Sequence, residues 1–115
     1  LFVLFNSFDK NNYKISMKFS YKIFKTGSYT LLAIADTAIL GKKYSDGDLE
    51  IDVKKDFYSE NSCTESDVTK LVRSATIVNA VGKDIITILI KNKIIGENHV
   101  LYINGMPHAQ IITLK

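Results

Sequence analysis

Two stretches early in the chain differ in how apolar and polar residues follow one another. Phe19, Tyr21 and Ile23 alternate with lysine and serine, which predicts a half-buried strand. A turn at 26–28 separates this strand from residues 29–35, where apolar residues stand at consecutive positions. Strands that are buried on both faces have this composition, so 29–35 is predicted to be the antiparallel partner and to lie more centrally in the sheet.

Two later stretches also have the pattern of strands. Residues 49–54 alternate apolar and charged side chains after a turn with one glycine, which predicts a third strand with its acidic side chains in water. Asn104-Gly105 stands between the apolar stretches 100–103 and 107–114, and this dipeptide is a strong signal for a β-hairpin. Pro107 has no N–H to donate, so it is expected at an edge or at the start of its strand.

The segment between these strands has the pattern of helices. Two overlapping pairs have capping-box spacing: Ser62 with Glu65, and Thr64 with Asp67. Apolar residues then recur at helical spacing, at Val68, Leu71, Val72, Ala75 and Val78. Gly82 interrupts the pattern, which resumes beyond it. We therefore predict two consecutive helices, at about 64–80 and 83–94.

Strands on both sides of a helical segment, joined by hairpins, indicate an α+β domain. The predicted domain spans 17–115 and has a mainly antiparallel sheet, packed by the two helices and closed by the C-terminal hairpin. Residues 1–16 differ from it, because the apolar run 1–5 is followed by serine, asparagine and aspartate. We interpret 1–16 as a leader or non-core extension ahead of a start at Met17; an extra strand is the alternative. An ordered extension would pair with a sheet edge or a second copy, so a homo-oligomer is possible through it.

Composition limits the class of protein. The chain has 115 residues, 46% of them hydrophobic, and no apolar run long enough to span a membrane. Its one cysteine, Cys63, cannot form an internal disulfide, and the acidic residues around it predict an inert thiol. Cys63, His99 and His108 lack metal-ligand spacing, so no metal or other cofactor is predicted. We expect a soluble, cytoplasmic protein.

The charge is small but unevenly distributed. The formal net charge is +3, below that of an obligate nucleic-acid binder. Residues 1–44 carry seven lysines against two acids, residues 45–67 carry two against eight, and residues 68–115 carry six basic residues against two acids. If the fold separates these signs, a basic face can attract RNA or an acidic protein.

Few motifs point to chemistry. Gly41-Lys42 and Gly82-Lys83 lack the upstream glycine and the following serine or threonine of a phosphate-binding P-loop. Gly82-Lys83 is placed to open a helix, where free backbone N–H groups beside an ammonium group bind anions. His108 and Gln110 lie on one face of the last strand and offer hydrogen bonds to a base, a phosphate or a backbone group; a histidine satisfied by local hydrogen bonds is the alternative.

Five segments of the chain resemble a known family. They are Ala33–Asp36, Leu40–Lys42, Phe57-Tyr58, Ala75–Lys83 and Ile103–Gln110. Their order is similar to that of the archaeal family called domain of unknown function 424, over about residues 17–115. Ala35 stands where the family often has a cysteine, so thiol chemistry is not implied. The resemblance implies an archaeal protein with a role in translation or RNA processing.

The resemblance also selects candidate binding residues. Those in the matching segments are Asp36, Gly41, Lys42, Asn79, Gly82, Lys83, His108 and Gln110. On the predicted helix, Asn79 and Lys83 share a face, and the hairpin would add His108 and Gln110 to the same patch. The alternative is that Asn79 caps the first helix.

Three functions remain open: a non-catalytic RNA- or ribonucleoprotein-binding module, a small phosphorylated-ligand or nucleotide-binding protein or enzyme that uses His108 and Lys83, and a protein–protein adaptor. A closed pocket that joins Asn79, Lys83 and His108 would favour the second, and an open basic surface would favour the first.

Overall fold

The computed structural model describes residues 18–113. Its elements in chain order are β1 (Phe19–Thr26), β2 (Tyr29–Asp36), the 3-10 helix η1 (Thr37–Ile39), β3 (Lys43–Asp46), β4 (Leu49–Asp52), α2 (Lys55–Tyr58), β5 (Asn61–Cys63), α3 (Glu65–Ser74), β6 (Ile77–Val81), α4 (Lys83–Lys91), the 3-10 helix η2 (Glu97–His99), β7 (Leu101–Ile103) and β8 (Met106–Ile112). The predicted leader and any oligomer formed through it lie outside the described residues.

A six-stranded sheet organises the fold, with the strand order β5-β1-β2-β6-β8-β7. The two central strands, β2 and β6, run parallel, and every other pair in this sheet is antiparallel. Strands β3 and β4 form a separate two-stranded hairpin. The predicted α+β class, with a mainly antiparallel sheet and a C-terminal hairpin around Asn104-Gly105, is confirmed.

The predicted extent of the first helix is wrong. Helix α3 begins after Thr64, whose N–H donates to the Asp67 carboxylate at 3.1 Å as the second of the two capping pairs predicts, but it ends at Ser74. Residues 77–80, predicted as the last turn of this helix, belong instead to β6, which ends at Val81. Val78 and Val81 lie on opposite faces of this strand and are both fully buried. The segment therefore lacks the alternation of apolar and polar residues by which a half-buried strand is recognised in a sequence. The second helix also ends earlier than predicted, at Lys91 rather than 94.

The two faces of the sheet pack against different elements. On one face, α3 and α4 cover Phe19, Leu32 and Val78. On the other face, η1, α2 and the β3–β4 hairpin cover smaller residues, including Ala33 and Ala35. The sheet therefore lies between a helical layer and a thinner layer of short elements.

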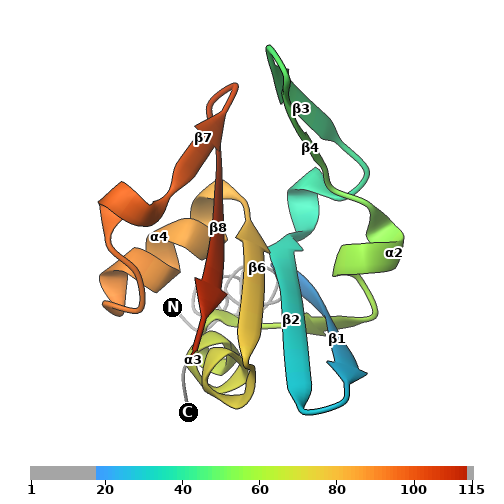
Figure 1. Cartoon of the computed structure of the whole chain (residues 1–115), viewed down its shortest axis with the longest axis vertical. Coiled ribbons are helices and arrows are strands. Elements are labelled where there is room, and N and C mark those ends of the chain that lie inside the picture. Colours follow the sequence, from blue (N-terminus) through green and yellow to red (C-terminus); the bar gives the residue numbers. More distant parts are fainter. Residues whose placement is uncertain (1–17, 114–115) are drawn as a thin grey trace, which may run out of the picture.

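Two hairpins project from the same end of the molecule. Figure 1 shows β3–β4 and β7–β8 rising side by side above the central strands, with α2 at the base of the first hairpin. Strands β3 and β4 both contact β7. The second hairpin turns through Asn104 and Gly105, both at positive φ. This paired arrangement leaves a cleft between the two hairpins.

Candidate functional site

A cleft of about 300 Å³ separates the two hairpins. Residues 49–52 of β4 line one side of it, and Leu101 and Ile103 of β7 line the other. Tyr58, Asn79 and His108 also line it, so this cleft gathers polar residues from α2, β6 and β8. Two of the three, Asn79 and His108, belong to the predicted binding set.

Tyr58, Asn79 and His108 form a hydrogen-bonded triad. The Tyr58 hydroxyl donates to Asn79 Oδ1 at 2.7 Å, and His108 Nε2 lies 3.0 Å from the same oxygen. Because an amide oxygen only accepts, His108 must carry its proton on Nε2, which makes Nδ1 an acceptor. The strand register explains the proximity, since Asn79 pairs with Gln110, and His108 lies two residues before Gln110 on the same face.

The triad is uncharged near neutral pH. Burial raises the pKa of Tyr58 to about 12, so its hydroxyl keeps its proton. Burial also lowers the pKa of His108 below its usual 6.5, which favours the neutral imidazole. A neutral set of donors and acceptors selects uncharged hydrogen-bonding groups and gives a phosphate no special attraction.

Gln110 faces Asn79 across the β6–β8 pair and has an exposed side chain. The predicted joining of Asn79, His108 and Gln110 on one surface therefore matches their placement. The reason given for Asn79 is wrong, because this residue lies on a strand and neither shares a helix face with Lys83 nor caps a helix.

Asp36 and Gly82 belong to a different structure, the junction between β2 and α4. The Asp36 carboxylate accepts hydrogen bonds from the backbone N–H groups of Asp84 at 2.9 Å and Ile85 at 2.8 Å. Gly82 has a φ of +129°, and a Cβ at this position would overlap the Asp36 carboxyl group. Burial raises the pKa of Asp36, and the two backbone hydrogen bonds partly offset that rise. The N-terminus of α4 is thus already bound to a carboxylate of the protein itself, and its predicted use as an anion site is not supported.

Lys83 lies apart from the triad. It lines a separate pocket of about 340 Å³ together with Tyr102 and Pro107, whereas His108 lines the cleft. Since Pro107 and His108 are neighbours on β8, they point to opposite faces of that strand. The structure therefore does not bring Lys83 and His108 together as a single ligand site would require.

Gly41 and Lys42 lie at the base of the β3–β4 hairpin. Gly41 has a φ of +84°, and its N–H donates to the backbone oxygen of Val53, two residues before α2, at 2.6 Å. A Cβ at Gly41 would lie 3.7 Å from Cε of Lys55. The backbone oxygen of Lys42 accepts a hydrogen bond from the N–H of Val53 at 2.9 Å, so Lys42 stands beside the residues that lead into α2.

Four lysines surround α2 at this base, and we call them the lysine surface: Lys22, Lys42, Lys54 and Lys55. The Nζ of Lys22 donates to the backbone oxygen of Asp56 at 3.1 Å, which places this side chain against α2. Lys42, Lys54 and Lys55 are exposed, and within residues 18–113 no member of the set forms a salt bridge. Lys54 follows the cleft residue Asp52 by two positions, so the surface borders the cleft.

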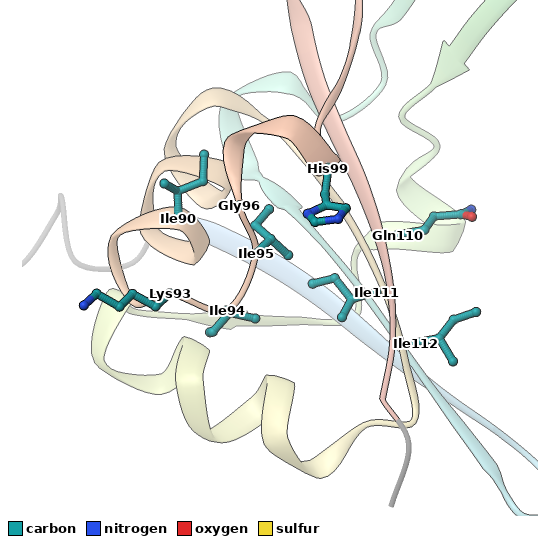
Figure 2. Close-up of a pocket in the computed structure, with 9 residues that line it drawn as sticks. All are labelled: Ile90, Lys93, Ile94, Ile95, Gly96, His99, Gln110, Ile111 and Ile112. Atoms are coloured by element: carbon teal, nitrogen blue, oxygen red, sulfur yellow. The ribbon is translucent and has the colours of Figure 1, made fainter.

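Figure 2 shows a second, more apolar groove beside the C-terminal end of α4. It has a volume of about 640 Å³. Ile111 points toward Ile95 on one side of β8, whereas Gln110 and Ile112 project from the opposite side (Figure 2). His99 is exposed at the rim. Among residues 18–113, no three His, Cys, Asp or Glu side chains gather as a metal site.

Cys63 is buried beneath α3. Burial and the nearby Asp67 raise the pKa of its thiol to about 11, which is the low reactivity predicted from the sequence, although burial is the larger cause. In the part of the chain that the structure describes, no helix is long and apolar enough to cross a membrane.

Tyr58, Lys54 and Lys55 are not among the predicted site residues. Phe57-Tyr58 belongs to a segment that resembles the family, and the Lys54-Lys55 pair comes at the end of a predicted strand with no motif around it. A buried tyrosine usually needs a hydrogen-bond partner for its hydroxyl, so Tyr58 could have been recognised once its burial was known.

Comparisons with known proteins agree with this architecture. The model of the family described as "Protein of unknown function (DUF424)" matches residues 24–114, and the chain belongs to this family. A crystal structure of an uncharacterized conserved protein from Methanopyrus kandleri is similar to this one with a TM-score of 0.71 and 21% sequence identity. The similarity covers 84% of this chain and 94% of that chain, and it supports the fold. A search of curated proteins gives no significant match.

Proposed function

We propose that this protein is a non-catalytic RNA- or ribonucleoprotein-binding module, which acts in the cytoplasm in translation or RNA processing. In this proposal the lysine surface contacts phosphates, and the cleft beside it faces the bound strand. The observation that carries the proposal is the gathering of Lys22, Lys42, Lys54 and Lys55 around α2 without a carboxylate partner.

Unpaired surface lysines suit a polyanion. A lysine held by a carboxylate must break that ion pair before it can bind a phosphate, whereas these four lysines bear no such cost. Lys42, Lys54 and Lys55 are remote in sequence from Lys22, and the fold brings them to one surface. The local positive charge there is therefore larger than the net charge of +3 suggests. The acids between residues 46 and 52 lie along the hairpin. Asp56 in α2 and Glu60 just beyond it are also exposed, but neither forms a salt bridge with these four lysines.

The alternative of a phosphorylated-ligand enzyme has weaker support. It needs Lys83 to clamp an anion while His108 transfers a proton, and these residues line different pockets. Nε2 of His108 is already engaged with Asn79, and burial makes its imidazole a weaker base. The neutral hydrogen-bonding groups of Tyr58, Asn79 and His108 are therefore better suited to binding a ligand than to transferring a proton.

Titrations of fluorescent single-stranded RNA at three salt concentrations test the proposal. The double variant Lys42→Ala/Lys55→Ala should lower the slope of log K against log salt by about 1.4, since each single-strand phosphate contact contributes roughly 0.7. Circular dichroism at the same pH would establish that the variant keeps the fold.

The matched control is Lys70→Ala/Lys91→Ala, which removes the same charge from α3 and α4 in the helical layer. This control should retain the wild-type slope. Equal slopes for the two double variants would mean that the protein responds only to net charge. Wild-type binding weaker than about 100 µM near physiological salt would reject the RNA function itself.

A further inference from the structure

We infer that the cleft between the two hairpins binds a single unstacked nucleobase, with its polar edge on the Tyr58–Asn79–His108 triad and its ring between Leu49 and Leu101. This inference rests on the proposed function and specifies what the cleft contributes to it. It assigns the lysine surface to the phosphates and the cleft to the base.

The size and position of the cleft favour one ring system. Its volume of about 300 Å³ is at the lower end of small-molecule pockets, too small for a folded partner. It opens beside α2, where Lys54 follows the cleft residue Asp52. A nucleotide with its phosphate on Lys54 or Lys55 can therefore direct its base into the cleft.

The walls supply apolar surface. Leu49 is 49% exposed and Leu101 is 47% exposed, so each of these cleft residues keeps about half of its surface in contact with water. They come from opposite hairpins, and a flat ring between them would cover both. Bases bind proteins largely by covering their faces in this way, with little dependence on sequence.

The floor supplies a hydrogen-bonding edge without charge. Asn79 Oδ1 accepts from both Tyr58 and His108, so the Asn79 amide group and the Nδ1 acceptor of His108 are held in fixed orientations. Base edges present neutral donors and acceptors, and such edges pair with side-chain amides and imidazoles. A phosphate would find no cation in this triad, while a base would find directional partners.

Two acidic residues of β4 stand beside the cleft and disfavour an anion there. Glu50 and Asp52 are among the residues around it, on the face of β4 opposite Leu49 and Ile51, and the Asp52 carboxylate lies 4.0 Å from Lys43 Nζ. Carboxylates accept hydrogen bonds from the amino groups of bases but repel phosphates. The cleft and the lysine surface therefore have opposite preferences, although they are adjacent.

An uncharged nucleoside separates the cleft from the lysine surface. In NMR titrations of the full chain, guanosine, adenosine, cytidine and uridine should each be tested, and at least one should shift the amides of residues 101–103 and 79 in a saturable way. Those shifts should persist in Lys42→Ala/Lys55→Ala. They should be lost or weakened in Leu49→Ala/Leu101→Ala, two half-exposed positions where truncation leaves the core intact.

Oligonucleotides provide the second arm. An RNA of fixed length should bind about fivefold or more tightly than the same backbone with abasic sites, and Tyr58→Phe should reduce that ratio by about two- to tenfold without changing the salt slope. Tyr29→Phe is the control, because it also removes one hydroxyl but from an exposed tyrosine outside the cleft.

The outcomes distinguish the two proposals. Equal affinity for abasic and intact RNA, with normal salt dependence, overturns the base site and leaves the lysine surface in place. Nucleoside shifts at the cleft with no measurable RNA binding support the base site and reject the RNA function. Shifts at the cleft with an extended peptide but with no nucleoside would overturn the base site in favour of a protein ligand.

Discussion

The β2–α4 junction and the cleft floor both hold polar side chains against the sheet, but they use them differently. At the junction, both carboxylate oxygens of Asp36 accept backbone hydrogen bonds, and Gly82 leaves no space for anything else. At the cleft floor, both hydrogen bonds of the triad end on one atom, Asn79 Oδ1, and the triad borders open volume. Saturated polar groups stabilise a fold, whereas oriented groups with remaining capacity can bind a ligand.

The comparison predicts the largest stability loss at the junction. Gly82→Ala should lower the free energy of unfolding by about 2–4 kcal/mol, because the new Cβ strains a positive φ and displaces the Asp36 carboxylate. Urea denaturation measures this loss. The control is Gly27→Ala, at a φ of +58° with no neighbouring atoms within 4 Å, where only the backbone strain of about 1–2 kcal/mol is expected. Equal losses in both variants would mean that contact with Asp36 contributes nothing.

The second prediction concerns the carboxylate itself. Asp36→Ala leaves the N–H groups of Asp84 and Ile85 without their acceptor, so we expect a loss of about 1–3 kcal/mol in the free energy of unfolding. Thermal unfolding followed by circular dichroism provides the measurement. Asp46→Ala, at the exposed end of β3, serves as the control and should change stability by less than about 0.5 kcal/mol. A neutral Asp36→Ala variant would show that the junction does not depend on this link.

The third prediction moves to the cleft floor, where the effect on stability should be smaller. Tyr58→Phe keeps the buried ring and removes one hydrogen bond to Asn79, for an expected loss of about 1 kcal/mol. Chemical denaturation of this variant beside Asp36→Ala compares the two sites directly. If Tyr58→Phe is the more destabilising of the two, the triad is a structural feature rather than a binding site.

The smallest predicted effect is a dependence of stability on pH. Because burial lowers the pKa of folded His108 below 6.5, the unfolded chain binds more protons between the two values. Stability should therefore rise with pH through this window below 6.5 and level off above it, with a slope of at most about 1.4 kcal/mol per pH unit. His108→Gln should flatten this part of the profile, while His99→Gln at an exposed position should not. An unchanged profile in His108→Gln would assign the dependence to another group.

The fold class could be predicted from sequence because most of its elements have distinct patterns. Phe19, Tyr21 and Ile23 face one side of an edge-proximal strand, and Asn104-Gly105 defines a turn that only positive φ allows. Residues close together in the sequence determine both the alternating strand and the turn. The β1–β2 pair and the β7–β8 hairpin therefore appear where the pattern places them.

Strand β6 could not be predicted in the same way. Its residues continue the helical spacing of α3 through Val78, and a strand buried on both faces has no alternation to contradict that interpretation. The β-branched residues from Thr76 to Val78 favour a strand, but this local preference is weak. The strand forms because this segment lies in the centre of the sheet. Asn79 and His108 were predicted to lie close together, and they do, but Asn79 lies on a strand beside β8 rather than on a helix face.

Only some of the candidate binding residues lie at the cleft. The sequence does not show whether a polar side chain already has hydrogen-bond partners within the fold. Asp36 and His108 are both polar residues in segments that match the family. Only the three-dimensional pairing reveals that Asp36 is fully engaged by α4 and that His108 faces a cleft. Tyr58 is placed at the cleft by α2, a helix of four residues, which is too short to show a periodic pattern in the sequence.

The parallel pairing of β2 with β6 also determines how the chain must fold. Forty residues, 37–76, separate the two strands, so the centre of the sheet cannot close until this long crossover has been drawn together. The β1–β2 hairpin needs only a short turn and can form within microseconds. We expect a transition state in which that hairpin is already paired and the arrival of β6 limits the folding rate. Ribosomal synthesis delivers β1 and β2 well before β6, so the nascent chain exposes an unfinished β2 edge until about residue 81 has emerged.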